Sequence, residues 1–211
     1  MKKILFYCLS IQLLTFYGCK KENEDTTSTV QENTPNPYQE RLNNGETPFE
    51  IYQSGVSVDS LYGTTYQGGL IAHLDTINGN GIVASPLDES EGFEWGYADT
   101  LVSGADGTSI GTGKQNTADI LKASTETNSA AYFCDTLTLR GYSDWFLPSK
   151  NELNLLRKNL YKKGFGDFEN NGYWSSTDVD LENAQGQGFV NGNFFSTDKS
   201  AIFFVRAVRE F

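Results

Sequence analysis

Residues 141–152 have the sequence GYSDWFLPSKNE, and the last four of them mark the start of a helix. The Ser149 hydroxyl can accept a hydrogen bond from a first-turn amide, and the Glu152 carboxylate can accept one from the Ser149 amide. Apolar residues then recur at helical spacing, namely Leu153, Leu156 and Leu160. Gly164 is of the residue type that commonly follows a helix. The stretch therefore predicts an amphipathic helix that begins after Ser149.

Short strands are predicted on either side of this helix. Alternating apolar residues separated by Gly and Asn turns are typical of hairpins. The expected strands are 68–75 paired with 81–84, 188–190 paired with 193–195 across Asn191-Gly192, and 201–209. Helical spacing also runs through 116–137, with a break near 125–127 and a cap near Asn116. These elements predict an α+β domain with short antiparallel strands, about two helices and long loops.

A series of motifs in this order resembles the DUF1566 domain, which forms the C-terminus of the Legionella collagen-like adhesin. The motifs are Gly68-Gly69-Leu70-Ile71, Glu94-Trp95-Gly96, Ile110-Gly111-Thr112-Gly113-Lys114, the 141–149 stretch, Tyr173-Trp174-Ser175-Ser176-Thr177 and Val205-Arg206-Ala207-Val208-Arg209. The resemblance spans roughly residues 66–211 and implies a C-type-lectin-like fold. It also implies what the adhesin does, which is to bind sulfated glycans and to form trimers.

The N-terminus has the pattern of a lipoprotein signal. Lys2 and Lys3 precede an apolar stretch at 4–17, which is too short to span a bilayer, and Gly18-Cys19 follows it. Residues 1–18 are predicted to be a signal peptide, and Cys19 is predicted to carry the lipid after cleavage. The alternative is an ordinary signal peptide with an incidental cysteine.

Residues 19–48 are predicted to be a lipid-anchored flexible tether, because their polar composition buries too little apolar surface to offset the entropy of ordering. The acid-rich run at 20–25 resembles the surface-export tags of lipoproteins of the Bacteroidota, or it only keeps the stalk solvated. The domain is expected at 49–211. These features predict an outer-membrane lipoprotein on the periplasmic face or the cell surface, held to the membrane by its lipid alone.

The charge pattern narrows the choice of partners. The net charge of −11 argues against nucleic acid, which draws on a dense basic face. One basic stretch stands out, and it predicts a ligand-binding face formed by Arg157, Lys158, Lys162 and Lys163. The alternative is a solvated helix face. Trp174 could stack on a sugar ring, although Trp95, Trp145 and Trp174 are better explained as core residues. The loop at 178–187, which has no apolar pattern, is a further candidate for the binding surface.

No catalytic constellation is visible in the sequence. His73 is the only histidine, and its apolar neighbours favour a structural role. Cys134 has no second cysteine beside it in the domain and is expected to be buried. The loop at 111–115 lacks the Ser or Thr of a phosphate-binding loop, so nucleotide binding is excluded. The chain is therefore predicted not to be an enzyme.

No cofactor is predicted either. Acidic residues gather at Asp88, Glu89, Glu91, Glu94, Asp99 and Asp106. Carboxylates of this kind could hold a calcium ion, but they lack EF-hand spacing, so no metal is predicted.

The expected function is that of a surface or outer-membrane binding and adhesion module. Its expected partner is an extracellular glycan or protein, and trimer formation is implied by the family resemblance. The alternative function is that of a structural or assembly lipoprotein of the envelope that binds another protein.

Overall fold

The computed structural model describes residues 36–88, 92–96 and 99–211. Residues Pro35–Phe211 form one compact unit. The predicted signal peptide, the lipid site at Cys19 and the acidic run at 20–25 lie outside the described residues. In the part that is described, no helix has the length and apolar character needed to cross a membrane.

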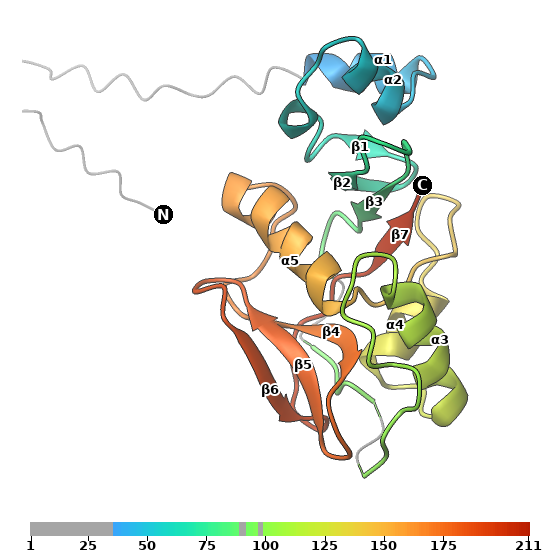
Figure 1. The fold of residues 1–211 in the computed structure, drawn as a ribbon, viewed down its shortest axis with the longest axis vertical. Coiled ribbons are helices and arrows are strands. Elements are labelled where there is room, and N and C mark those ends of the chain that lie inside the picture. Colours follow the sequence, from blue (N-terminus) through green and yellow to red (C-terminus); the bar gives the residue numbers. More distant parts are fainter. Residues whose placement is uncertain (1–35, 89–91, 97–98) are drawn as a thin grey trace, which may run out of the picture. The chain divides into compact units, whose positions relative to one another are not determined.

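Two antiparallel sheets form the β part of the domain (Figure 1). The four-stranded sheet has the order β1-β2-β3-β7, with β1 at Thr65–Tyr66, β2 at Gly69–Leu74, β3 at Gly81–Ala84 and β7 at Val208–Glu210. The three-stranded sheet has the order β4-β5-β6, with β4 at Gly172–Asp178, β5 at Asn183–Gly188 and β6 at Phe194–Asp198. The predicted hairpin of β2 with β3 is confirmed, and β7 joins it from the far end of the sequence.

Helix α5, Lys150–Asn159, lies between the two sheets and contacts β2, β4 and β5 (Figure 1). Its predicted capping box is confirmed, because the Glu152 amide donates to the Ser149 hydroxyl and the Ser149 amide donates to the Glu152 carboxylate. A short 3-10 turn, Tyr161–Lys163, follows α5 and ends at Gly164, whose φ of 75° favours glycine. The apolar stripe of α5 is fully buried.

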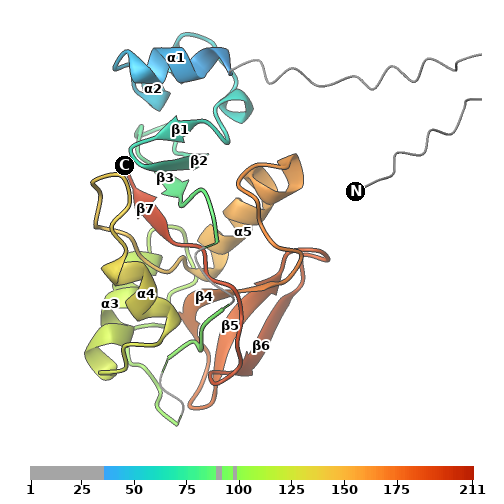
Figure 2. The ribbon, with the colours of Figure 1, turned by 180° about the vertical axis from the view of Figure 1, so that it is seen from behind.

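Helices α3, Gly113–Ala123, and α4, Ala130–Thr136, pack against each other, and α3 also contacts β4 (Figure 2). They confirm the predicted helical stretch with its break. Helix α3 begins before the expected cap at Asn116, whose side chain instead donates to the Gly107 carbonyl at 2.7 Å. Gly113 allows this start, since a Cβ there would lie 2.2 Å from a Glu152 carboxylate oxygen.

The predicted boundary between tether and domain is wrong. Residues 36–48, assigned to the tether, belong to the folded unit and include helix α1, Pro37–Asn43. Leu42 is buried in the main core, and the Gln39 side chain exchanges two hydrogen bonds with the backbone of Thr65. The polar composition hid two local signals, namely an Asn36 cap before a proline and a Thr47 capping box.

Helix α2, Pro48–Gln53, and a 3-10 turn, Val58–Ser60, complete the N-terminal part. The described residues thus hold five α-helices rather than about two. The α+β class and the antiparallel sheets are confirmed. Three strand predictions are corrected. β5 begins at Asn183 and so occupies half of the predicted loop at 178–187, and the predicted strand at 201–209 is regular only at Val208–Glu210. The hairpin predicted for 188–190 with 193–195 exists as β5 with β6, but β5 ends at Gly188 and β6 begins at Phe194.

Candidate binding surface on helix α5

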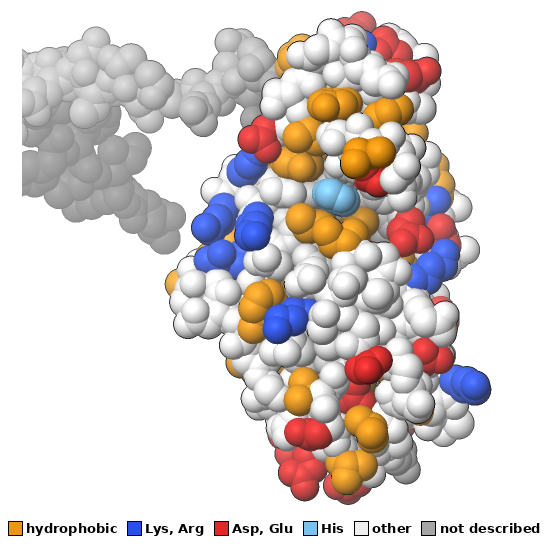
Figure 3. All heavy atoms as spheres, in the orientation of Figure 1, with side chains coloured by type: hydrophobic (Ala, Val, Ile, Leu, Met, Phe, Trp, Pro, Cys, Tyr) orange, Lys and Arg blue, Asp and Glu red, His pale blue; other side chains and the backbone are white. Residues whose placement is uncertain are grey.

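The basic residues predicted to bind a ligand lie on and just after α5. Lys158, Lys162 and Lys163 are exposed, and Lys150 is partly exposed at the first turn. We call these four lysines the α5 basic surface. Lys and Arg side chains gather on one face of the domain over the place where Figure 1 draws α5 (Figure 3). Sequence and structure therefore agree that this stretch forms a local basic region on an acidic protein.

The four lysines differ in how far they are engaged. The Lys163 ammonium lies 3.1 Å from the Asp59 carboxylate and 5.0 Å from the Tyr62 ring centroid. The Lys150 ammonium lies 4.6 Å from the ring centroid of Phe194. The side chains of Lys158 and Lys162, by contrast, form no hydrogen bond or ion pair with any residue in the described part of the chain. These two ammonium groups are the ones available to a ligand without breaking an existing contact.

Arg157 does not belong to this surface, which corrects the prediction. It is only 9% exposed, and its Nε donates to the Phe189 carbonyl at 2.7 Å. A second nitrogen donates to the Val190 carbonyl at 3.3 Å. Arg157 lies four positions after Leu153 and three before Leu160, so it shares the buried stripe of α5. Its guanidinium holds the turn between β5 and β6 rather than a ligand.

Trp174 is also removed from the candidate site. Its side chain is fully buried, its indole nitrogen donates to the Phe93 carbonyl at 2.9 Å, and the Phe203 ring packs edge-on at 4.9 Å. Trp95 and Trp145 are buried as well. The core interpretation is therefore confirmed for all three tryptophans, and none of them presents a face to a sugar.

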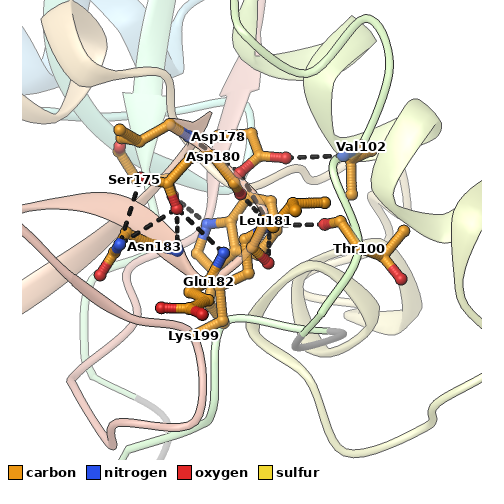
Figure 4. Close-up of polar contacts among 11 residues, drawn as sticks. Thr100, Val102, Ser175, Asp178, Asp180, Leu181, Glu182, Asn183 and Lys199 are labelled. Carbon is orange, nitrogen blue, oxygen red and sulfur yellow. Dashed lines mark hydrogen bonds and ion pairs between the residues drawn. The ribbon is translucent and has the colours of Figure 1, made fainter.

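A buried network that the sequence did not indicate lies at Lys199 (Figure 4). The Lys199 side chain is completely buried, and its ammonium lies 2.9 Å from the Asp178 carboxylate and 4.9 Å from the Trp95 ring centroid. It also donates to the carbonyls of Thr100 and Asp180 at 2.7 and 2.8 Å. The other Asp178 oxygen accepts from the Val102 amide at 2.7 Å. Lys199 thus ties residues 100–102 to the β4–β5 turn.

The turn held by Lys199 is itself pre-shaped. The Asp180 carboxylate accepts hydrogen bonds from the backbone amides of Asn183 and Glu182, and these bonds lower the pKa of Asp180. Only residues 179–182 remain between β4 and β5, so the expected ten-residue binding loop is a short, hydrogen-bonded turn. The connection between β4 and β5 is therefore too short to form a long, adaptable loop.

Of the acidic residues considered for calcium, Asp88 is engaged by other side chains. Asp88 forms an ion pair with Arg206 at 2.6 Å and accepts from the Tyr173 hydroxyl. Glu89 and Glu91 lie outside the described residues. Among the residues described, no group of three or more His, Cys, Asp or Glu side chains could hold a metal ion.

The two residues considered for catalysis, Cys134 and His73, differ in burial. Cys134 is fully buried, as expected, and burial raises the pKa of its thiol well above the ordinary value. His73 is only half-buried on β2, and within the described residues its imidazole has no hydrogen-bond partner. It is therefore not the satisfied core histidine that the sequence suggested.

A comparison with protein families identifies the family of this chain. The family model of the Lcl C-terminal domain matches residues 87–209, which is more than half of the chain. The chain belongs to the Lcl C-terminal domain family. No curated protein matches the chain. The resemblance read from the motifs is thus confirmed, and membership indicates an adhesin-like surface module.

The match to the Lcl C-terminal domain covers only part of the folded domain. It contains α5, the three-stranded sheet and the Lys199 network, and it begins after β2, β3 and helices α1 and α2. The α5 basic surface therefore lies within the family domain. The motif at Gly68-Gly69-Leu70-Ile71 lies before the matched residues, although it forms the start of β2.

Proposed function

We propose that this protein is a non-enzymatic adhesion module that binds an anionic extracellular glycan through the α5 basic surface. The observation that carries the proposal is the pair Lys158 and Lys162, exposed and unengaged within the described residues on a chain of net charge −11. Membership of an adhesin-like family supports a binding role. In this proposal Cys19 carries the lipid that displays the domain on the outer membrane or cell surface, on a C-type-lectin-like scaffold.

The chemistry of the surface defines the kind of glycan recognised. The planar guanidinium of Arg157 has the donor geometry that suits sulfate, but it already donates hydrogen bonds to the backbone carbonyls of Phe189 and Val190. The remaining donors are lysine ammonium groups, which act as point charges. Binding through this surface should therefore follow the charge density of the glycan and weaken as salt rises. A sulfated polysaccharide meets this requirement better than a neutral one.

The test uses residues 36–211 as the folded unit, a sulfated polysaccharide such as heparin, and its desulfated counterpart. We expect binding of the sulfated form only, and a loss of about tenfold or more in affinity for the double variant Lys158→Glu/Lys162→Glu. The matched control is Lys114→Glu/Lys122→Glu, which reverses two exposed lysines on α3. Equal binding by both double variants would refute the role of the α5 basic surface.

The alternative, a structural or assembly lipoprotein, predicts a different result. Cross-linking in intact cells would then yield one dominant protein partner, and the charge-reversed domain would retain it. Protease shaving of whole cells would report whether the domain faces the medium, which the adhesion proposal requires.

A further inference from the structure

A small pocket lies on the four-stranded sheet, and none of the α5 lysines lines it. It is formed by the β2–β3 hairpin, the end of β7 and the loop at 110–111, with a volume of about 200 Å³. Its lining residues are His73, Asp75, Asn80, Gly81, Ile82, Ile110, Gly111 and Glu210. In Figure 3 the only pale blue side chain, the single histidine of the chain, lies among hydrophobic side chains on this face. The volume suits one side-chain-sized group rather than a nucleotide or an oligosaccharide.

The pocket has apolar walls. Ile82 is buried and forms one of them, whereas Ile110 is 48% exposed and projects from the loop before α3. The half-buried imidazole of His73 adds a flat aromatic surface. Ile110, Ile82 and the imidazole of His73 thus line the same small hollow with apolar surface. These groups would shield the apolar stem of a ligand.

The charges of the pocket have one sign. Asp75 is held ionised, because hydrogen bonds from the Ile77 amide and the Asn78 side chain lower the pKa of its carboxyl group. Glu210 is exposed on β7, and its side chain makes no hydrogen bond or ion pair with a described residue. Burial lowers the pKa of His73, so the imidazole is neutral at pH 7 and adds no positive charge. No lysine or arginine lines the pocket.

Two backbone donors at the pocket, the amides of Gly111 and Gly81, are already used, which leaves fewer donors for an anion. The Gly111 amide donates to Glu152 at 2.7 Å, and the Gly81 amide donates to the Phe211 carbonyl at 3.0 Å. The groups that remain for a ligand include the Glu210 carboxylate, which only accepts, and the neutral imidazole of His73, which has one accepting nitrogen. Such a site favours a ligand that donates hydrogen bonds and carries positive charge.

We propose that this pocket binds a primary ammonium group on a short apolar stem. The ammonium would lie between Glu210 and His73, and its stem would lie against Ile82 and Ile110. A lysine side chain of a partner protein and a simple alkylamine share this chemistry. Of the lining residues only Ile110 and Gly111 fall within the matched family span, 87–209, so the site is a property of this chain beyond its family domain. It is independent of the glycan-binding proposal.

The test is a titration of residues 36–211 with butylammonium at pH 7, followed by the NMR signal of the His73 imidazole. We expect a saturable shift with butylammonium and none with butanol, its neutral counterpart. Glu210→Gln should weaken binding about threefold or more, because it removes the unpaired carboxylate while leaving the backbone pairing of β7 intact. Glu126→Gln, a change at an exposed acid on the loop after α3, should leave binding unchanged.

Three outcomes would overturn the proposal. They are a linear shift without saturation, an equal response to butanol, and equal butylammonium binding by wild type and Glu210→Gln. The backbone amide spectrum of Glu210→Gln controls for folding. If that variant were unfolded, Ile110→Ser would replace it, since Ile110 is exposed and lines the same pocket. It should also weaken butylammonium binding, because it removes one apolar wall, and unchanged binding would equally count against the site.

Discussion

The Lys199 network and the α5 basic surface both contain lysine side chains, but the first is buried and the second is exposed. Lys199 is fully buried, with a carboxylate, two close carbonyls and an indole ring around its ammonium. Lys158 and Lys162 are exposed and make no polar contact with a described residue. Lysine therefore serves two purposes in this domain. One lysine fixes the turns of the domain, and the others leave their charge to whatever approaches from solution.

The largest expected effect is that of breaking the buried pair. Lys199→Met would leave the Asp178 carboxylate buried without its counter-ion, and we expect a loss of about 3–5 kcal/mol in the free energy of unfolding. Urea unfolding followed by tryptophan fluorescence measures it, since Trp95 adjoins the ammonium. Adding Asp178→Asn should restore part of the loss, because Asn is neutral and can still accept from the Val102 amide. A loss below about 1 kcal/mol for Lys199→Met would contradict this view of the network.

A smaller effect is expected where a cation is buried on α5 itself. Arg157→Met keeps an aliphatic stem but removes the donors to the carbonyls of Phe189 and Val190, which should cost about 1–3 kcal/mol. The neighbouring change Lys158→Met is the control and should alter stability by less than about 0.5 kcal/mol. Both are measured by urea unfolding. If the two variants were equally stable, the Arg157 side chain would not stabilise the fold, and it would remain a candidate for binding a ligand.

Reversing the exposed charges should leave the fold almost unaffected. For Lys158→Glu/Lys162→Glu we expect a change in the free energy of unfolding within about 1 kcal/mol, the sum of two surface substitutions. Thermal unfolding at low and high salt measures this change. A large loss of stability would show that these lysines stabilise the fold. It would contradict the view that their charges are free to bind a ligand, on which the adhesion proposal rests.

The smallest expected effect concerns His73. Because burial lowers its pKa in the folded state below the ordinary value of 6.5, the unfolded chain binds a proton at higher pH than the folded chain does. Its contribution to stability is therefore complete above about pH 6.5 and is lost as pH falls through the lower folded-state pKa. NMR titration should place the midpoint of His73 below 6.5, and His73→Gln should remove this part of the pH dependence. A midpoint above 6.5 would reverse the sign.

The parts of the fold that the sequence predicted correctly are set by residues close together in the chain. The Ser149 and Glu152 capping box spans four residues, and the hairpin of β2 with β3 is set by its own turn. The family motifs added the order of elements, since they place α5 before the strand that carries Trp174. Local signals also exist for α1 and α2, in the Asn36 cap and the Thr47 capping box, but they lie in a stretch, 36–48, whose polar composition favours a tether.

The candidate site was predicted only in part, because the role of a charged side chain depends on partners far away in sequence. Lys199 stands in the polar stretch Thr197-Asp198-Lys199-Ser200 and looks like a turn residue, yet its partners lie at 100 and at 178–181. Arg157 was grouped with its basic neighbours, although its spacing from Leu153 and Leu160 placed it on the buried stripe. His73 needed Ile110 and Glu210, which come from other segments, before its pocket could be seen.

The position of β7 has a consequence for how the domain is made. This strand, at Val208–Glu210, pairs with β3, and Val208 also bridges to Phe146 just before α5. A growing chain that has not reached residue 208 cannot close the four-stranded sheet, however long its first three strands have existed. Pairing over such sequence separations is slow compared with the formation of hairpins or helices. The domain therefore completes its four-stranded sheet late in folding, after its hairpins and helices have formed.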